Sequence, residues 1–418
     1  MAEKIPTPRK WIVTQIGARQ HYAAARGFLA QGRLTQFYTD IWARRSNSVL
    51  RRLPGPWPAL AGRFHDAFPP SRVTSFSVGG MARLYQFRRT RTTETAYESF
   101  MKTGEWFCGK VNRSLGVRDL NPAEHAAFLF NTGALETIEY LRPRGVPCLL
   151  DQIEPARVEE DVTLEECKKW PDWQKSPGRI PEAYFNRLSR EWAAADVVMV
   201  NSSWTQRALV QQGVAAEKIA IVPQAYESEF PAGPIERKRK PGTPLQVLWI
   251  GQVILRKGIP YLFEAAKQLL NENIQFAVAG WVGINAPALQ TAPANVRIIG
   301  PVPRAQTPNL YRAADVFVLP TMSDGFAITQ LEAMSFGLPV IATERCGDVV
   351  SDGVDGTIIP AGDSNALAAA IYLLYREPDR LAAYSRAAID KAGQFSLSRF
   401  VDGVDATLAT GLRRRTGA

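Results

Sequence analysis

The 418-residue chain contains few cysteines and histidines, and neither type is spaced as a zinc site requires. The four cysteines form no C-x-x-C pair, and the three histidines show neither i,i+4 nor H-E-x-x-H spacing. The sequence therefore predicts no metal site. Since no disulfide framework is visible either, we expect reduced thiols in a cytoplasm.

Long apolar runs are also missing. No stretch of 18 or more apolar residues occurs, which argues against a membrane-spanning helix. The first residues lack the apolar core of a secretory signal. We therefore expect a cytoplasmic protein, with at most a peripheral place on the inner face of the membrane.

The chain has fewer acidic than basic residues. It contains 50 Lys and Arg but only 40 Asp and Glu, which gives a net charge of +10. A basic surface would attract anionic lipid, a phosphorylated substrate or nucleic acid, or it would simply be a solvated face. No RRM, KH or zinc-finger pattern supports a nucleic-acid partner. The basic residues cluster at 44–45, 51–52, 83–91, 237–240 and 413–415.

The chain is long enough for two domains of roughly 200 residues each. Apolar residues make up 46% of it, which is typical of a globular protein. Short apolar runs alternate with helical segments in two series, and this alternation predicts an α/β fold with parallel, doubly wound sheets. A charged Pro/Gly-rich stretch at 231–244 separates the series and is typical of a linker. Strands are expected at 10–16, 34–39, 126–130, 147–150 and 197–200, then at 245–250, 275–279, 296–299, 316–319, 340–342 and 357–359.

The run 323–343 holds two carboxylates, Asp324 and Glu332, with a Gly-Phe turn between them. We expect a helix from near Ala327 to the Gly-Leu-Pro at 337–339, followed by a short apolar strand. Both carboxylates would then face one cleft, with free N–H groups of the helix start between them. This arrangement suits a polyhydroxylated ligand with a negatively charged leaving group, such as a nucleotide sugar. A capped helix leading into a buried strand is the alternative.

Two loops that follow the first strand of each series carry further polar residues. The segment 17–21 holds Gly17 and His21 before a helix, where backbone N–H groups suit a phosphate. The segment 250–259 holds Arg256 and Lys257 before a second helix. A fixed Arg-Lys pair stabilises charge on a departing diphosphate, while an exposed basic turn and a structural histidine are the alternatives.

The run 323–343 resembles the signature of retaining glycosyltransferases of family 4, an E-x7-E pair within a GFG…EAM…G-PVIA segment. Gly325 and Glu332 match it, whereas Asp324 stands at the first Glu and Ala327 at the second Gly.

Other segments resemble the same family. The segment 250–259 resembles its G-R-L-x-x-x-K-G element, with Lys257 matching and Gln252 in place of Arg. The segment 17–21 resembles its G-G-x-x-x-H element, with one glycine and a matching His21. The resemblance covers residues 11–400 and is strongest over 245–363.

The resemblance implies a GT-B fold, in which two Rossmann-like domains face a cleft and the C-terminal helix crosses back to the first domain. The expected division is an acceptor-side domain at 1–230 with a variable insertion at 42–110, a nucleotide-sugar-binding domain at 245–395, and a crossing helix with a basic tail at 396–418.

The implied activity is transfer of a hexosyl unit from a UDP- or GDP-sugar, with retention, in polysaccharide or glycoconjugate biosynthesis. The acceptor would be a saccharide, a lipid-linked molecule or a small molecule, and neither cofactor nor metal is implied. Arg256, Lys257 and Asp324 would be catalytic. The implied donor-binding residues are Gly17, His21, Val302, Gly325, Phe326, Ala327 and Glu332.

The chain departs from the family after the strand at 126–130, where many relatives place a histidine and this chain has Asn131 or Thr132. Asp151 and Glu154 follow the next strand, at an edge where open α/β sheets bind ligands. A non-catalytic sugar-nucleotide-binding subunit and an epimerase or hydrolase on the same fold remain alternatives. A Rossmann oxidoreductase is not favoured, because no G-x-G-x-x-G follows the first strand.

Overall fold

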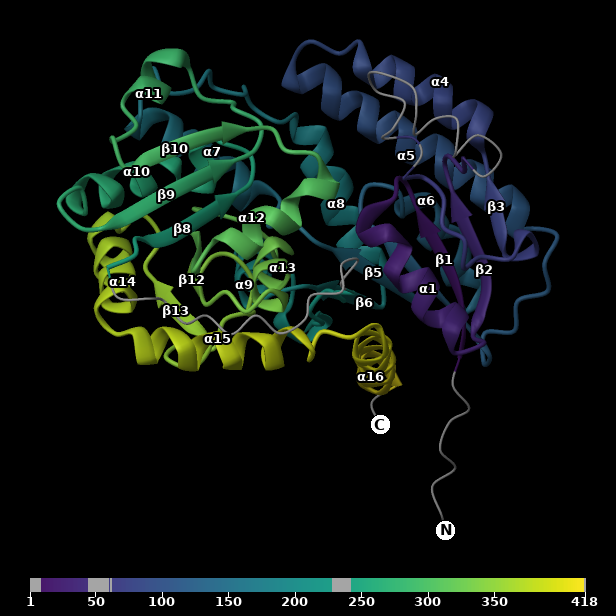
Figure 1. Ribbon diagram of the computed structural model, residues 1–418. Helices are drawn as coiled ribbons and strands as arrows, with labels where there is room; N and C mark the ends of the chain where they lie inside the picture. Colours follow the sequence, from purple (N-terminus) through teal and green to yellow (C-terminus); the bar gives the residue numbers. More distant parts are fainter. Residues whose placement is uncertain (1–8, 44–59, 61, 228–241, 417–418) are drawn as a thin grey trace.

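Two parallel β-sheets stand side by side in the computed structural model, which describes residues 9–43, 60, 62–227 and 242–416 (Figure 1). Residues 231–241 of the expected linker lie outside the described part, and so do the basic clusters at 44–45, 51–52 and 237–240.

The first sheet has seven strands in the order β3-β2-β1-β4-β5-β6-β7, and all neighbouring strands pair in parallel. Its strands are β1 (Lys10–Gln15), β2 (Leu34–Thr39), β3 (Val73–Ser75), β4 (His125–Phe130), β5 (Cys148–Gln152), β6 (Val197–Val200) and β7 (Ile219–Ile221).

The second sheet has six parallel strands in the order β10-β9-β8-β11-β12-β13. Its strands are β8 (Leu245–Ile250), β9 (Ile274–Ala279), β10 (Val296–Gly300), β11 (Val316–Leu319), β12 (Val340–Thr343) and β13 (Gly356–Ile359).

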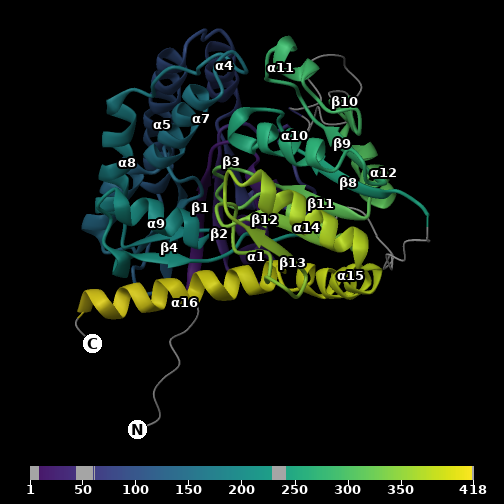
Figure 2. The same cartoon turned by 90° about the vertical axis from the view of Figure 1, so that its left-hand side faces the viewer.

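Helices cover both faces of each sheet (Figures 1 and 2). Those in the first half are α1 (Ala23–Ala30), α4 (Ser77–Arg88), α5 (Thr93–Leu115), α6 (Leu135–Leu141), α7 (Arg157–Lys169), α8 (Glu182–Ala194) and α9 (Ser203–Gln211). The others are α10 (Ile259–Gln268), α11 (Ala286–Gln290), α12 (Thr307–Ala313), α13 (Thr329–Ser335), α14 (Ser364–Arg376), α15 (Pro378–Ala392) and α16 (Leu397–Thr416).

The strand order reverses once in each sheet, between β1 and β4 and between β8 and β11. At such a switch point the connections leave in opposite directions, so a crevice opens at the carboxyl ends of the strands. The loops after β1, β8 and β11 carry the polar motifs noted in the sequence. Topology therefore brings these motifs to the sheet edges where ligands bind in this class of fold.

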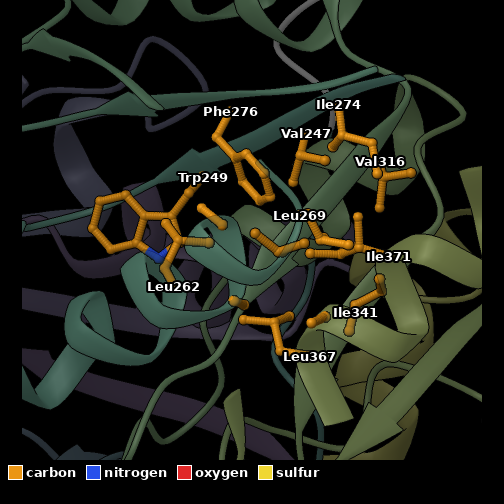
Figure 3. Close-up of a cluster of buried hydrophobic side chains, with 14 of the residues drawn as sticks. Val247, Trp249, Leu262, Leu269, Ile274, Phe276, Val316, Ile341, Leu367 and Ile371 are labelled. Carbon is orange, nitrogen blue, oxygen red and sulfur yellow. The ribbon is translucent and has the colours of Figure 1, made fainter. Parts of the chain in front are cut away.

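The strands of the second half are continuous apolar runs because both faces of their sheet are buried. Leu262 of α10 and Leu367 of α14 pack with Val247, Phe276 and other strand residues on one face of the sheet (Figure 3). A separate cluster from α12, α13 and α15 covers the opposite face. Since both faces are buried, alternating polar residues have no solvent to face.

The last helix, α16, leaves the second half and packs beneath the first (Figure 2). Its buried Val401 and Val404 join the core formed by Trp11 and Phe28. The side chain of Asp405 accepts a hydrogen bond from Arg33 Nη2 at 2.7 Å, as part of an ion pair. The crossing helix expected from the resemblance is thus present.

Region 42–110, expected as an insertion, contributes an edge strand to the first sheet. Within it, β3 pairs in parallel with β2 over three residues. The sequence did not predict this strand, because Val-Thr-Ser carries a single apolar side chain. The same region supplies α4 and most of α5, which cover this half.

Among the described residues, no helix is both long and apolar enough to cross a bilayer. All four cysteines carry free thiols.

The contact between α1 and α16 can be tested with Gly27→Ala, because overpacking and helix propensity would change the free energy of unfolding in opposite directions. A Cβ on Gly27 would lie 2.4 Å from Val401 Cγ2. We expect Gly27→Ala to lower the free energy of unfolding by about 1–3 kcal/mol through overpacking, although helix propensity alone would raise it by about 0.5–1 kcal/mol. Urea unfolding measures the change.

In a Val401→Ala background the clash is removed, so Gly27→Ala should become stabilising. Destabilisation of equal size in both backgrounds would mean that the two helices do not meet at these residues.

Candidate functional site

A cavity of about 950 Å³ lies between the two halves. Gln20 and His21, which follow β1, line it from the first half, and Arg304 and Glu332 line it from the second. The segment 224–227, which comes after β7, forms part of the same wall. His21 and Glu332, two expected donor-binding residues, therefore share one cavity.

Glu332 is held by two partners at this wall. It lies on α13 and is 4% exposed. Its Oε2 accepts a hydrogen bond of 2.7 Å from the Tyr311 hydroxyl of α12, and its Oε1 pairs with Arg304. Burial and the neighbouring carboxylate raise the pKa of Tyr311 well above its usual value, so this hydroxyl stays a donor. The Arg304 side chain is half exposed and lines the cavity.

Lys257 and Asp324 form an ion pair that joins the loop after β8 to the loop after β11. The side chains are 15% and 17% exposed. Burial raises the pKa of Asp324, but the charges of Lys257 and Arg256 outweigh it and hold the pKa below the usual value. Asp324 is therefore a carboxylate that is poised to accept hydrogen bonds.

A glycine permits this junction. Gly258 has φ +76°, and a Cβ there would lie 1.7 Å from the carbonyl oxygen of Pro320. Any side chain would push the 3-10 turn at Leu255–Lys257 away from the loop after β11. Gly258 therefore allows the close backbone contact that holds the neighbouring Lys257 beside Asp324.

Arg256 faces the first half. Its Nη1 donates a hydrogen bond of 2.6 Å to the carbonyl oxygen of Ser323 and lies 3.4 Å from Glu159 of α7. Burial raises the pKa of Glu159, although Arg256 acts against it. The expected diphosphate-binding cations therefore both contact carboxylates, and neither lines the 950 Å³ cavity.

Gly325 marks a close contact of the two halves. A Cβ at this position would lie 1.9 Å from the carbonyl oxygen of Ile153 and 3.0 Å from Asn201 Nδ2. The loop after β11 thus rests on the carboxyl end of the first sheet, which closes the cleft beside Asp324.

The two residues after Gly325 differ in their surroundings. Phe326 is 2% exposed and packs edge-on against Phe395 at 6.0 Å between ring centroids, so only its main chain is available to a ligand. Ala327 adopts φ +52°, a conformation that favours glycine. Because this left-handed residue interrupts the chain, α13 begins at Thr329 rather than near Ala327 as expected.

The loop after β1 is strained. Gln20, His21 and Tyr22 are three consecutive residues with positive φ, each of which costs about 1–2 kcal/mol for a side chain other than glycine. The N–H of Gly17 donates to Asp40 Oδ1 at 2.9 Å, so a phosphate would have to compete with this carboxylate for it. His21 is exposed at the cavity, whereas Gly17 is not among its lining residues.

Val302 lies beyond β10 and is partly exposed. It does not line the cavity, although Arg304, two positions on, does. Val302 is thus connected to the cavity only by belonging to the same loop as Arg304.

A polar network lies at the carboxyl ends of β4 and β5. Asn131 Oδ1 accepts from Arg19 at 3.2 Å, and its Nδ2 donates to Glu154 at 2.5 Å. Asp151, at the end of β5, is 3% exposed. Burial raises its pKa to about 7, although Arg19 lowers it, and Glu154 adds to the rise.

Three residues with roles in this geometry were not named from the sequence: Arg304, Tyr311 and Glu159. Each belongs to a helix or loop whose local pattern is ordinary, and its importance comes from a partner in another element. Among the described residues, no group of three or more His, Cys, Asp or Glu side chains is placed to hold a metal ion.

Residues 244–377 match the family described as glycosyl transferases group 1. The chain is also 28% identical to D-inositol 3-phosphate glycosyltransferase 1 of Catenulispora acidiphila over 323 residues, which cover 72% of the chain and 73% of that protein. It is 27% identical to the amylovoran biosynthesis glycosyltransferase AmsK of Erwinia amylovora over 47% of the chain and 51% of that protein.

Residues 244–377 thus carry the pattern of the glycosyl transferases group 1 family, which the sequence was predicted to resemble.

Solved structures agree on the fold. HepE of Anabaena in complex with UDP superposes with a TM-score of 0.60 at 15% identity, over 96% of this chain and all of that one. Sucrose-phosphate synthase of Thermosynechococcus elongatus gives 0.60 at 17% identity, over 98% and 99% of the two chains. The fold is GT-B, as expected, and the chain is a glycosyltransferase that takes its sugar from a nucleotide sugar.

Asp151 generates a test of pH dependence. Below about pH 4 it is protonated in both the folded and the unfolded chain, so its contribution to stability is fully present. As the pH rises towards 7, only the unfolded chain releases the proton, and that stability is lost. Asp151→Asn should make the fall of unfolding free energy between about pH 4 and 7 shallower, by up to about 1.4 kcal/mol per pH unit.

The measurement is urea unfolding across this pH range. Asp119→Asn, which changes an exposed carboxylate, is the control and should leave the slope unaltered. Parallel pH profiles for the wild type and Asp151→Asn would show that Asp151 does not titrate in this range.

Proposed function

We propose that the protein transfers a hexosyl unit from a UDP- or GDP-sugar, with retention of anomeric configuration, in polysaccharide or glycoconjugate biosynthesis. The acceptor is a saccharide, a lipid-linked molecule or a small molecule. The observation that carries the proposal is the buried Glu332 carboxylate at the wall of the 950 Å³ cavity. The UDP and UDP-glucose complexes of HepE support the class of donor.

Glu332 binds the ribose in this proposal. A carboxylate accepts hydrogen bonds from two neighbouring hydroxyls, and Tyr311 fixes its orientation from behind. When the ribose binds, Arg304 moves away from Glu332 and either points into the cavity or contacts the nucleotide phosphates. His21 faces the same space and contacts the donor from the first half.

Lys257 and Arg256 hold the diphosphate. As the bond between the sugar and the phosphate oxygen breaks, negative charge grows on that oxygen, and a fixed cation stabilises the transition state more than the bound donor. In the structure both cations contact carboxylates, so the donor phosphates replace or join these partners.

Asp324 accepts a hydrogen bond from a hydroxyl of the transferred sugar. Its lowered pKa keeps it ionised for this role. Gly325, Phe326 and Ala327 contribute main-chain N–H groups, although that of Phe326 already donates to Asp324. Gly17 lies across the cleft, and Val302 contacts the base through its main chain.

We further propose the domain division 1–230, 245–395 and 396–418, with 42–110 shaping the acceptor side. An exposed face of α4 and the loop after it contacts an anionic membrane in this proposal. Val78 is 90% exposed and Tyr85 62%, and Arg88, Arg89 and Arg91 are exposed beside them. Basic residues near an anionic surface each contribute about 1 kcal/mol.

Donor binding tests the function. UDP- or GDP-sugars should raise the melting temperature and should be turned over when a saccharide acceptor is added. Glu332→Gln removes a charged acceptor of hydrogen bonds, so donor affinity measured by calorimetry should fall by about tenfold to a hundredfold.

Glu264→Gln is the matched control, because Glu264 is exposed on α10 outside the cavity. If no nucleotide sugar stabilises the protein, the proposed function is wrong. Equal donor affinity in both variants would remove Glu332 from the ribose site.

Membrane contact is tested by co-sedimentation with vesicles. Vesicles containing phosphatidylserine should bind the protein more tightly than pure phosphatidylcholine vesicles, and Arg88→Glu should weaken this binding at least about fivefold. Arg376→Glu makes the same charge change on α14 of the other half and should have little effect. The proposal fails if the two variants bind alike.

A further inference from the structure

A second cavity, of about 320 Å³, lies within the first half between α5, α7 and α8. Tyr97 and Tyr184 contribute aromatic rings to its lining, and Glu154, Glu159 and Glu160 contribute carboxylates. The volume is at the low end of the range of about 300–1,000 Å³ for small-molecule sites, which suits one sugar unit. Nothing in the proposed donor site uses this space.

The aromatic wall is rigid. The rings of Tyr97 and Tyr184 meet edge-on with centroids 4.7 Å apart, and the Tyr184 hydroxyl lies 3.2 Å from Thr132 Oγ1. Burial, followed by the charges of Glu154, Glu159 and Glu160, raises the pKa of Tyr97 to about 12. The Tyr97 hydroxyl therefore remains a hydrogen-bond donor in a strongly negative field. Such rings offer an apolar face and a polar tip to a ligand.

The carboxylates are fixed in place. Glu154 accepts a hydrogen bond from Asn131, and Glu160 accepts one from the backbone N–H of Ile180. The described residues that line the cavity include no lysine or arginine. A phosphate placed there would meet three carboxylates, and like charges brought together in an interface oppose binding. Hydroxyl and ammonium groups would instead find acceptors.

Glu159 connects this cavity to the donor groups. It lines the cavity and lies 3.4 Å from Arg256, and its Oε2 is 3.5 Å from the hydroxyl of Ser323, next to Asp324. A ligand in the cavity would therefore present a hydroxyl beside the groups that hold the diphosphate and the sugar.

We propose that this cavity binds the acceptor, and that it selects a neutral or amine-bearing sugar unit over one that carries phosphate or carboxylate. This inference rests on the proposed function. In the transfer, the acceptor oxygen forms a bond to the anomeric carbon. The bond from that carbon to the phosphate oxygen breaks, its electron pair stays on the diphosphate, and the hydroxyl proton passes to a phosphate oxygen.

Ligand-detected NMR on the full chain with UDP present tests the selectivity without requiring turnover. Methyl glucoside and glucosamine should bind, and glucose 6-phosphate should bind at least about tenfold more weakly. Ala96→Trp fills the cavity from α5 and should weaken methyl glucoside binding about tenfold. Glu105→Trp adds the same side chain at an exposed position of α5 that does not line the cavity, and should bind like the wild type.

Tyr97→Phe gives a second variant in case the tryptophan disturbs folding. It keeps the ring, removes one hydroxyl, and should weaken binding about fivefold. Glucose 6-phosphate binding as tightly as methyl glucoside, no binding of any probe, or equal binding by Ala96→Trp and Glu105→Trp would each overturn the assignment. UDP-glucose binding, followed separately by thermal stabilisation, should be unchanged in all three variants. If neither UDP-sugars nor GDP-sugars stabilised the wild type, the result would count against the proposed function and not against the acceptor cavity.

Discussion

The ion pair between Lys257 and Asp324 is the contact on which the site geometry depends. It ties the first loop of the second sheet to the loop after β11, across the switch point of that sheet. A largely buried pair gains little net stability, because both charges lose hydration, but removing one partner leaves the other charge unsatisfied. The pair is therefore better understood as a positional device. It holds the residue next to Gly325, the glycine at which this loop meets the first half.

Opposite charges face each other at several points along the cleft. Arg256 meets Glu159 of the first half, and Arg304 meets Glu332 within the second. The arrangement keeps cations in a partly buried cleft without leaving them unpaired, which would cost several kcal/mol. A phosphorylated ligand can then exchange with a carboxylate instead of entering an uncompensated site. The first half supplies one of these carboxylates, Glu159, which also contributes to the negative charge of the smaller cavity.

Most strands were predictable to within a residue or two, because each is a short apolar run that ends at glycine, proline or a polar residue. Strands β3 and β7 were not predicted, since each has only three residues, which is too short for a periodic signal. Asp324 and Glu332 stood out because both belong to one contiguous segment. Glu159 and Arg304 did not, because their roles come from partners in other elements. The late start of α13 was hidden for a similar reason: only the fold shows that Ala327 adopts a left-handed conformation.

The path of α16 has a consequence for how the protein is made. Val401 and Val404 complete the core that contains Trp11 and Phe28, yet they are synthesised after the whole second half. The half that leaves the ribosome first is thus the half whose core closes last. During synthesis the apolar surface of α1 and β1 stays uncovered until α16 has been made. The two segments are more than three hundred positions apart in the sequence, as are Arg33 and Asp405, which pair across this contact. Contacts of such long range slow folding and prolong the time in which exposed apolar surface can aggregate. The second half, whose core is built from its own strands and helices, carries no such delay.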